Sequence, residues 1–241
     1  MHRFFANPAD IHDGLVILTG DEVAHMGRVL RLQCGDQVTV CDGQCREYRC
    51  VIRVLDKQSA RLEIIGQSEN TVECPVDITL YQGLPKADKM EYIIQKCVEL
   101  GVNCIVPVNT RRSVMKMKDY EKKQSRWQRI ALEAAKQCGR GIIPAVGSVC
   151  SLEDALSQGR GLKLMPYECE RGKSIRTALQ ANPLARQVSI YIGPEGGFDP
   201  VEVALAKEQR AWVVSMGPRI LRTETAPVAA VAAVLYELGD W

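Results

Sequence analysis

The sequence of 241 residues predicts a mixed α/β protein in which a small β-barrel domain precedes a larger domain built on a parallel sheet. Two patterns predict this order. Apolar and polar residues alternate over much of the first seventy residues, whereas from about residue 75 apolar strands alternate with amphipathic helices. The polar stretch QSENTVECP separates the two regions near residues 68–75. We therefore divide the chain into residues 1–72 and 73–241.

The predicted elements of the first domain begin with a short helix over residues 21–32. A strand at residues 38–40 leads into Asp42-Gly43, a dipeptide that favours a hairpin turn. The return strand carries on one face Tyr48, Cys50, Ile52 and Val54. A further alternating pair, Leu62 and Ile64, completes a set of short strands that is typical of a small barrel.

The second domain is predicted to begin with a strand over residues 76–81. The following helix has apolar residues at helical spacing, namely Met90, Ile93, Ile94, Cys97 and Val98, and Gly101 ends it. Strands are then expected at residues 104–108, 162–165, 188–192 and 212–216. Helices are expected in the basic segment 111–129 and at residues 173–180, 200–209 and 224–238. This alternation indicates a mostly parallel sheet with helices on both faces.

The composition is that of a folded soluble protein, with 46% hydrophobic and 25% charged residues. It excludes low-complexity disorder and collagen-like repeats. The first residues lack the apolar core of a signal peptide, and no stretch reaches the roughly 18 apolar residues of a membrane span. We expect a cytoplasmic protein that does not enter a membrane.

Ten cysteines are present, and the densest group is Cys34, Cys41, Cys45 and Cys50. This group contains no CxxC pair and no close histidine. We therefore expect no metal site, and we interpret these cysteines as small buried hydrophobic residues in a reducing compartment.

Positive charge is concentrated in one segment. Residues 1–73 hold 8 Lys and Arg against 11 Asp and Glu, whereas residues 74–241 hold 23 against 18. Much of the excess lies in residues 111–129, which contain Arg111, Arg112, Lys116, Lys118, Lys122, Lys123, Arg126 and Arg129. Such a segment is either a footprint for a polyanion or a solvated helix face. Trp127 within it is either a core residue or a platform for base stacking.

Two loops follow apolar strands and carry the candidate chemistry. The first, Ile192–Phe198, reads IGPEGGF and matches neither GxGxxG nor a P-loop. Its glycines let the backbone approach a ligand, and Glu195 favours a neutral or cationic ligand over a phosphate. The alternative is a tight connection alone. The second loop, Met216–Ala226, reads MGPRILRTETA, and parallel strand ends of this kind face one crevice.

The last helix is apolar all round, since no charged residue lies between Thr225 and Tyr236. A helix of this kind is buried, and it is too short to cross a membrane. Its small Ala and Val side chains suit either a position deep in the domain or an interface between subunits.

The two loop motifs, taken together, resemble those of the ribosomal RNA uridine-N3 methyltransferase family of the SPOUT superfamily, which acts on small-subunit (16S) ribosomal RNA. Similar segments extend along the chain: HRFF near the start, HMGRVLRLQCGD at 25–36, KADKMEYIIQKCVELGV at 86–102 and RRSV at 111–114. The resemblance implies an N-terminal PUA-like barrel that binds RNA and a C-terminal SPOUT α/β domain with a deep trefoil knot. It further implies a homodimer, with the last helix as the expected interface, and no metal.

The same resemblance implies S-adenosylmethionine as the methyl donor and assigns residues to it. The cofactor set is Met165, Pro166, Gly193, Pro194, Glu195, Gly196, Gly197, Met216, Gly217, Ile220, Leu221 and Thr225. Candidate catalytic residues are Arg222, to stabilise a developing uridine anion, and Glu195 or Glu224, as a general base. Candidate RNA-binding residues are Arg3, Arg28, Arg31, Lys86, Arg111 and Arg112.

These expectations define an S-adenosylmethionine-dependent methyltransferase acting on N3 of a uridine in 16S ribosomal RNA, either naked or in the assembled small subunit. The alternatives are a SPOUT methyltransferase that acts on another RNA base or site and a non-catalytic RNA-binding protein. The latter has no need of paired ligand loops at strand ends. A flavin or nicotinamide oxidoreductase would require phosphate recognition, against which Glu195 argues.

Overall fold

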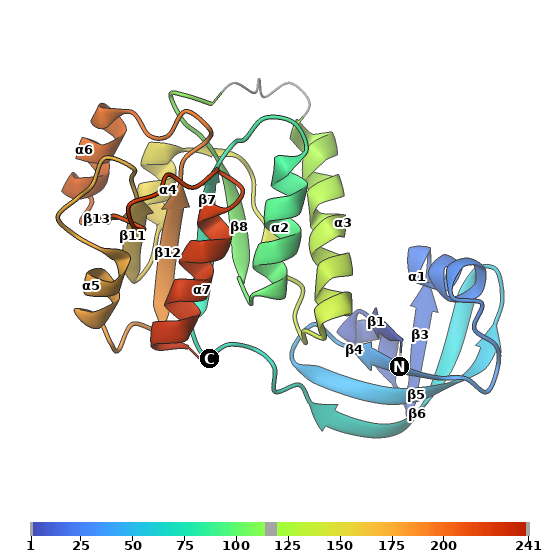
Figure 1. Ribbon diagram of the computed structural model, residues 1–241. Coiled ribbons are helices and arrows are strands. Elements are labelled where there is room, and N and C mark those ends of the chain that lie inside the picture. The colour runs from blue at the N-terminus through green and yellow to red at the C-terminus, as the bar shows by residue number, and fades with distance from the viewer. Residues whose placement is uncertain (1, 114–119, 240–241) are drawn as a thin grey trace. The chain divides into compact units, whose positions relative to one another are not determined.

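The computed structural model describes residues 2–113 and 120–239 (Figure 1). The chain forms two compact units. The first contains Met1–Glu73 together with Ala135–Ile143, and the second contains Cys74–Ala134 together with Pro144–Trp241. Residues 135–143 thus group with the first 73 residues, although they follow the predicted division by more than sixty positions. Sequence periodicity gives no signal for such a return of the chain.

The first unit is built on a curled, mostly antiparallel sheet in the order β1-β4-β5-β6-β3-β2. Its strands are β1 (Arg3–Phe5), β2 (Ile11–His12), β3 (Leu15–Thr19), β4 (Gln37–Cys41), β5 (Arg46–Leu55) and β6 (Ser59–Glu69). Only β1 and β4 pair in parallel among the described strands of this sheet. The core lies on the face that carries Phe4, Val40, Ile52 and Leu62, all fully buried.

The predicted alternation of the return strand is correct up to Ile52 and wrong at Val54. Tyr48, Cys50 and Ile52 are buried, whereas Val54 is 44% exposed. The pairing of β5 with β6 shifts register between Ile52 and Val54. Because such an irregularity inserts a residue into one strand, it turns the next side chain out of the core face.

The predicted helix at residues 21–32 is shorter and less regular in the structure. It consists of α1 (Asp21–Ala24) and a π-helical turn, η2 (His25–Val29). The amide of Leu30 donates to the carbonyl of His25 at 3.0 Å, which is the wider π-type hydrogen bond. Arg31 then has a φ of 53°, so the chain leaves the helix there. A short 3₁₀ turn, η1 (Pro8–Asp10), completes the unit.

The second unit has a parallel sheet in the order β10-β8-β7-β12-β11-β13, with β9 paired to β8. The strands are β7 (Asp77–Gly83), β8 (Cys104–Asn109), β9 (Ala145–Val146), β10 (Cys150–Ser151), β11 (Leu162–Pro166), β12 (Gln187–Ile192) and β13 (Trp212–Val214). β12 is central and buried along most of its length, as its apolar sequence predicts. The central strand β12 therefore follows both of its neighbours in the sheet, β7 and β11, in the sequence.

Helices cover both faces of this sheet, as predicted. They are α2 (Lys89–Glu99), α3 (Tyr120–Cys138), α4 (Leu152–Gln158), α5 (Ile175–Gln180), α6 (Pro200–Glu208) and α7 (Ala226–Leu238). Helix α7 packs against α2 and α5, and α4 packs against α6. None of the helices within the described residues is long and apolar enough to span a bilayer.

Helix α4 and the short strands β9 and β10 were not predicted. Seven residues give too little periodicity to identify a helix. A local signal is present nonetheless, because the Ser151 hydroxyl caps α4 by accepting a hydrogen bond from the amide of Asp154 at 3.0 Å.

The last helix has one buried face rather than an apolar surface buried all round. Ala230, Val231, Val234 and Leu235 are fully buried, while Tyr236 is 73% exposed. Ala229, Ala232 and Ala233 are half-buried. The position inside the domain therefore accounts for one side of the helix, and the other side carries half-buried alanines and the exposed Tyr236.

Candidate functional site

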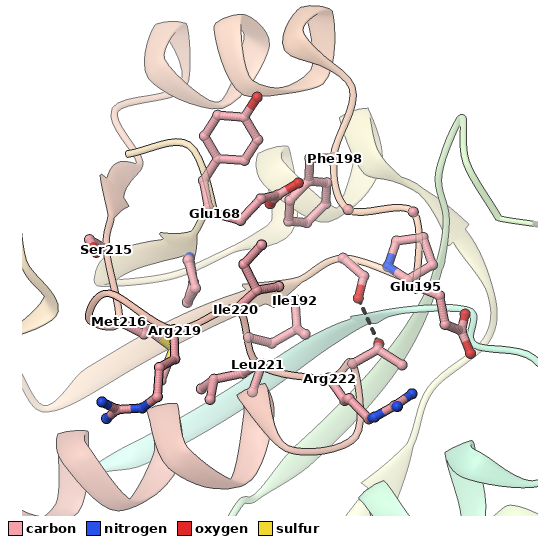
Figure 2. Close-up of a pocket in the computed structure, with 18 of the residues that line it drawn as sticks. Glu168, Ile192, Glu195, Phe198, Ser215, Met216, Arg219, Ile220, Leu221 and Arg222 are labelled. Atoms are coloured by element: carbon pink, nitrogen blue, oxygen red, sulfur yellow. Dashed lines mark hydrogen bonds between the residues drawn. The ribbon is translucent and has the colours of Figure 1, made fainter. Parts of the chain in front are cut away.

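A cavity of about 410 Å³ lies at the carboxyl ends of β11, β12 and β13 (Figure 2). Three loops line it: the one after β11, the glycine-rich loop after β12, and the loop between β13 and α7. Lys89, at the start of α2, adds a side chain. A volume of this size and a position at the carboxyl edge of a parallel sheet are both typical of a small-molecule site.

The glycine-rich loop is a tight turn set close to the neighbouring strand. The amide of Gly197 donates to the carbonyl of Pro194 at 2.9 Å, and Gly197 has a φ of 65°. A Cβ on Gly83 would lie 2.8 Å from the Pro194 nitrogen, so β7 needs a glycine there. The turn ends in a capping box, in which Asp199 and Glu202 satisfy the first amides of α6.

The loop between β13 and α7 is joined to the glycine-rich loop by a buried hydroxyl. The hydroxyl of Thr223 donates to the carbonyl of Gly193 at 2.8 Å, which is the dashed contact in Figure 2. The same hydroxyl accepts a hydrogen bond from Gln82 Nε2 at 3.2 Å. Gln82 is fully buried and Thr223 is 6% exposed. The end of β7 therefore holds both loops in one arrangement.

The loop after β11 forms the third wall. The amide of Tyr167 donates to the carbonyl of Val214 at 2.9 Å, and the amide of Glu170 donates to the carbonyl of Tyr167 at 3.1 Å. This turn directs the carboxylate of Glu168 toward the cavity, where Figure 2 shows it beside Phe198. Phe198 is 2% exposed and supplies an apolar base behind the turn.

Lys89 bridges two carboxylates at the rim of the site. Its Nζ lies 3.1 Å from Glu195 Oε1 and 3.1 Å from Glu224 Oε2. The amide of Lys86 also donates to both oxygens of Glu195, at 3.1 and 3.3 Å. Burial raises the pKa of Glu195, but hydrogen bonds from its own amide, Lys89 and Lys86 outweigh it and leave that pKa below its ordinary value. The pKa of Glu224 is lowered in the same way, with burial opposed by its own amide and Lys89.

Comparison with known protein families assigns the chain to a family. Residues 72–235 match a family model described as an RNA methyltransferase domain, and residues 18–65 match one described as an RNA methyltransferase PUA domain. The chain belongs to this RNA methyltransferase family.

Relatives of known name and structure agree with the assignment. The chain is 36% identical to ribosomal RNA small subunit methyltransferase E of Bacillus subtilis, over 91% of this chain and 89% of the relative. A crystal structure of ribosomal RNA small subunit methyltransferase E from Neisseria gonorrhoeae, bound to S-adenosyl methionine, is 33% identical with a TM-score of 0.88. It covers 100% of this chain and 99% of that chain.

A structure from Legionella pneumophila, described as a methyltransferase in complex with the cofactor SAM, is 32% identical with a TM-score of 0.90. It covers 99% of this chain and 98% of that chain. The predicted fold class, a PUA-like N-terminal unit followed by an α/β unit with a parallel sheet, is confirmed by the family match and these neighbours.

Most residues predicted to hold the cofactor of this family line the cavity at the carboxyl ends of β11, β12 and β13. They are Pro166, Gly193, Pro194, Glu195, Gly196, Gly197, Met216, Gly217, Ile220 and Leu221. Met165 does not line it, because it is fully buried in the core beside Phe198. Thr225 is exposed at the start of α7 and makes no side-chain capping bond. Successive side chains of a strand point to opposite faces, so Met165 points into the core while its neighbour Pro166 lines the cavity.

The cavity also contains residues that the sequence did not single out, including Lys89, Tyr167 and Glu168. Tyr167 and Glu168 directly follow the strand end at Pro166, so the strand-end rule that selected Pro166 applies to them as well. Lys89 had no such signal, because its position depends on how α2 packs. Gln82 was missed because its contact with Thr223 depends on the order of the strands in the sheet.

The predicted catalytic and RNA-binding residues differ in their exposure and in the contacts that their side chains make. Arg222 is exposed and lines the cavity. Glu195 also lines it, but Glu224 contacts it only through Lys89. The RNA candidates Arg28, Arg31, Lys86, Arg111 and Arg112 are all exposed.

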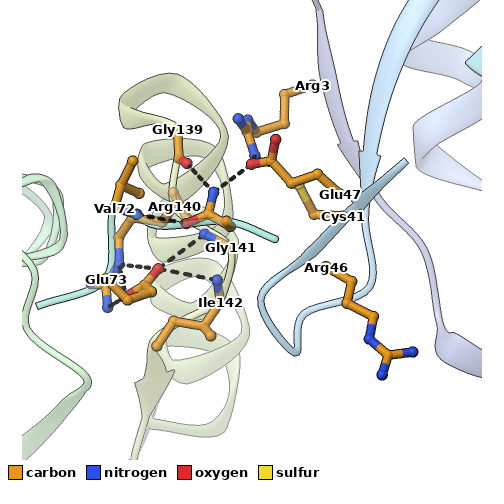
Figure 3. A network of polar contacts seen from close by, with 12 residues as sticks. Arg3, Cys41, Arg46, Glu47, Val72, Glu73, Gly139, Arg140, Gly141 and Ile142 are labelled. Atoms are coloured by element: carbon orange, nitrogen blue, oxygen red, sulfur yellow. Dashed lines mark hydrogen bonds and ion pairs between the residues drawn. The ribbon is translucent and has the colours of Figure 1, made fainter. Parts of the chain in front are cut away.

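Arg112 and Arg3 are engaged with neighbouring groups. Arg112 Nη1 donates to the carbonyl of Gly196 at 2.8 Å, and its Nη2 lies 3.4 Å from Asp199 Oδ2. Arg112 therefore supports the glycine-rich loop. In the first unit, Arg3 Nη1 lies 2.6 Å from Glu47 Oε1, and the pair belongs to the polar network in Figure 3.

Within that network, the Glu73 carboxylate accepts three hydrogen bonds from Arg140, the shortest at 2.7 Å. The amide of Gly141 donates to Glu73 at 2.9 Å. Arg140 is 3% exposed, so this pair holds residues 139–142 onto the first unit. The position of Arg3 beside these groups favours a structural role for its guanidinium.

Other predictions concern the basic segment and metals. Trp127 is 4% exposed and therefore a core residue. Lys116 and Lys118 lie outside the described residues. All ten cysteines are free thiols. Within residues 2–113 and 120–239, no group of three or more His, Cys, Asp or Glu is placed to hold a metal ion.

The residues of the cavity fit S-adenosylmethionine. The walls are mainly backbone, glycine and apolar side chains such as Ile192 and Leu221. They contain no phosphate-binding motif. Glu168 provides a carboxylate for a cationic ligand, and Lys89 already neutralises Glu195.

Proposed function

We propose that the protein is an S-adenosylmethionine-dependent methyltransferase that methylates N3 of a specific uridine in small-subunit (16S) ribosomal RNA. The observation that carries the proposal is the cavity formed by three strand-end loops in a chain of the RNA methyltransferase family. The similarity of more than 30% to two structures with S-adenosylmethionine bound supports the cofactor. The similarity to ribosomal RNA small subunit methyltransferase E supports the substrate.

In this proposal, residues 73–241 are the catalytic SPOUT domain and residues 1–72 are the PUA-like RNA-binding barrel. The glycine-rich loop and the loop before α7 hold the donor, with Pro166 on the third side. The proposal includes a deep trefoil knot formed by these loops, which the hydrogen bond between Thr223 and Gly193 brings together across thirty residues of sequence. S-adenosylmethionine supplies a methyl group on a positively charged sulfur, which becomes a neutral thioether when the methyl group moves to N3.

The side chains then position the uridine and stabilise the negative charge that develops as its N3 proton is lost. N3 lies on the Watson–Crick edge, so the base must be unpaired, and its N–H proton must pass to solvent water as the N–C bond forms. Arg222 is exposed at the cavity and stabilises the negative charge that develops on the base. Glu195 and Glu224 are weak bases because their pKa values are lowered. Their stronger contribution is to hold Lys89 and the glycine-rich loop.

RNA contacts are proposed for both units. Arg28 and Arg31 border the π-helical turn of the first unit, and Lys86 and Arg111 are exposed in the second. Neutralising any one of them should weaken binding to RNA of every sequence to a similar extent. Each substitution should also reduce the number of counterions released on binding by about one. Arg3→Gln is the contrasting variant, since that side chain pairs with Glu47. An unchanged salt slope in Arg28→Gln and Arg31→Gln would remove these residues from the interface.

We further propose that the protein works in the cytoplasm as a homodimer. The half-buried alanines and exposed Tyr236 of α7 offer the surface for the second copy. Light scattering that shows a monomer at working concentration would contradict this.

Mass mapping of modified nucleotides tests the reaction. Ribosomal RNA from cells lacking the protein should lose one N3-methyluridine in 16S RNA, and the wild-type gene should restore it. The Arg222→Ala variant should restore little of it while still binding S-adenosylmethionine in calorimetry. Comparing naked RNA with assembled small subunits in vitro identifies the form that is methylated. An unchanged set of modified nucleotides in the deletion strain would refute the proposed substrate.

A further inference from the structure

The two acidic side chains that line the cavity, Glu168 and Glu195, differ in whether their carboxylates are paired. Glu195 is held by Lys89 and by the amide of Lys86. Within the described part of the chain, the Glu168 carboxylate makes no hydrogen bond or ion pair, yet the residue is half-buried and lines the cavity. An acidic group in a partly enclosed site is stable only where a cation or solvent meets it.

The cations near Glu168 are directed elsewhere. Arg171 Nη1 donates to the backbone carbonyl of Glu168 at 3.0 Å, not to its carboxylate. Arg112 donates to the carbonyl of Gly196 and contacts Asp199. Both guanidiniums therefore stabilise loops, and neither neutralises the Glu168 carboxylate.

The backbone around Glu168 fixes where the carboxylate lies. The turn from Tyr167 to Glu170 is closed by a backbone hydrogen bond of 3.1 Å and is joined to the end of β13 through Tyr167. The carboxylate lies against Gly197: a Cβ on that glycine would be only 3.1 Å from Glu168 Oε2 and closer still to Oε1. Gly197 is thus required both for its φ of 65° and for the room it leaves the carboxylate.

We infer that Glu168 recognises the positively charged part of the methyl donor. This inference rests on the proposed function, since the donor in question is S-adenosylmethionine. Its sulfonium and its α-ammonium are the two cationic groups, and Glu168 is the carboxylate left to face them once Lys89 has neutralised Glu195. Glu168 therefore determines specificity for a cationic ligand over a neutral adenosine derivative.

Calorimetry with three ligands of graded charge tests the inference. S-adenosylmethionine carries both cations, S-adenosylhomocysteine retains only the ammonium, and 5′-methylthioadenosine has neither. In Glu168→Gln, affinity for S-adenosylmethionine should fall about tenfold, while affinity for methylthioadenosine should stay within a factor of two of wild type. A loss confined to S-adenosylmethionine assigns Glu168 to the sulfonium. An equal loss for S-adenosylhomocysteine assigns it to the ammonium.

The matched control is Glu208→Gln, which removes an exposed carboxylate at the end of α6, away from the cavity. It should leave all three affinities unchanged. Equal affinity of wild type and Glu168→Gln for S-adenosylmethionine, or a parallel loss for methylthioadenosine, would overturn the inference and leave the methyltransferase assignment intact. Failure of the wild-type protein to bind S-adenosylmethionine would overturn both.

Discussion

The hydroxyl of Thr223 joins three segments of the second unit, so its removal should loosen the whole donor site. The variant Thr223→Val keeps the shape of the side chain but loses two hydrogen bonds. One is donated to the carbonyl of Gly193 at 2.8 Å and the other is accepted from Gln82 at 3.2 Å. Gln82 keeps its bond to the carbonyl of Gly83 at 3.0 Å, whereas Gly193 loses its side-chain donor.

The expected cost follows from burial. Thr223 is 6% exposed and Gln82 is fully buried, so water does not readily replace either bond. With a net value of about 1 kcal/mol for each hydrogen bond, the second unit should lose ~2 kcal/mol of stability. For a unit of this size the thermal midpoint should fall by roughly 4–8 °C. Binding of S-adenosylmethionine should weaken as well, because the ligand must then order loops that the hydroxyl holds in the wild type.

Tryptophan fluorescence reports on this unit alone. All three tryptophans of the chain follow residue 73 in the sequence, and the two that the structure describes, Trp127 and Trp212, lie in the second unit. Thr223→Ser retains the hydroxyl and should lose no more than about 1 kcal/mol, the value of one buried methyl group. Thr225→Val alters an exposed threonine with no capping bond and should change stability by less than about 0.5 kcal/mol. If Thr223→Val were as stable as Thr225→Val, the hydroxyl would not join these loops.

Three further variants test other parts of the site by denaturation monitored through tryptophan fluorescence. Because the pKa of Glu195 lies below its ordinary value of 4.5, the pair with Lys89 should stabilise the protein above that pH and lose this effect as the pH falls. Lys89→Met should therefore reduce the loss of stability that occurs as the pH falls below 4.5, and an unchanged profile would contradict the pairing. Asp199→Ala removes the capping box of α6 and should cost about 1 kcal/mol; a neutral result would show that the cap is unimportant. Gly83→Ala places a Cβ 2.8 Å from the Pro194 nitrogen and should cost ~1–3 kcal/mol and weaken S-adenosylmethionine binding in calorimetry, whereas wild-type affinity would show that the loop adapts.

The sequence predicts the second unit well because its signals are local. The strand at β12 is a continuous apolar run, and the apolar residues of α2 recur at helical spacing; both elements lie where periodicity places them. The glycine-rich loop is equally local, since three glycines and a proline between a strand and a capped helix permit few conformations. These features explain why most of the predicted cofactor residues meet in one cavity.

Features that depend on long-range packing could not be predicted. Gln82 and Thr223 lie 141 positions apart, and only the sheet order brings them together. Residues 139–142 join the first unit through Arg140 and Glu73, which nothing in the charge pattern indicates. Val54 is exposed because β5 and β6 change register, an event set by pairing and not by composition. Sequence periodicity predicts which side of a single helix or strand is buried. The features above depend instead on contacts between different elements.

The charges of the cavity divide according to the two ligands that the proposed reaction brings together. Four of the charged side chains that line it are cations, and the described contacts engage Lys89 with Glu195 and Arg171 with backbone carbonyls. Arg219 and Arg222 remain exposed, on opposite sides of the loop in Figure 2. A polyanionic RNA requires such cations at the mouth of the site, whereas a cationic donor requires a carboxylate within it. Because Glu195 is paired with Lys89, Glu168 is the carboxylate that remains for the donor. Neutralising Arg219 or Arg222 should therefore weaken RNA binding, whereas neutralising Glu168 should weaken binding of the donor.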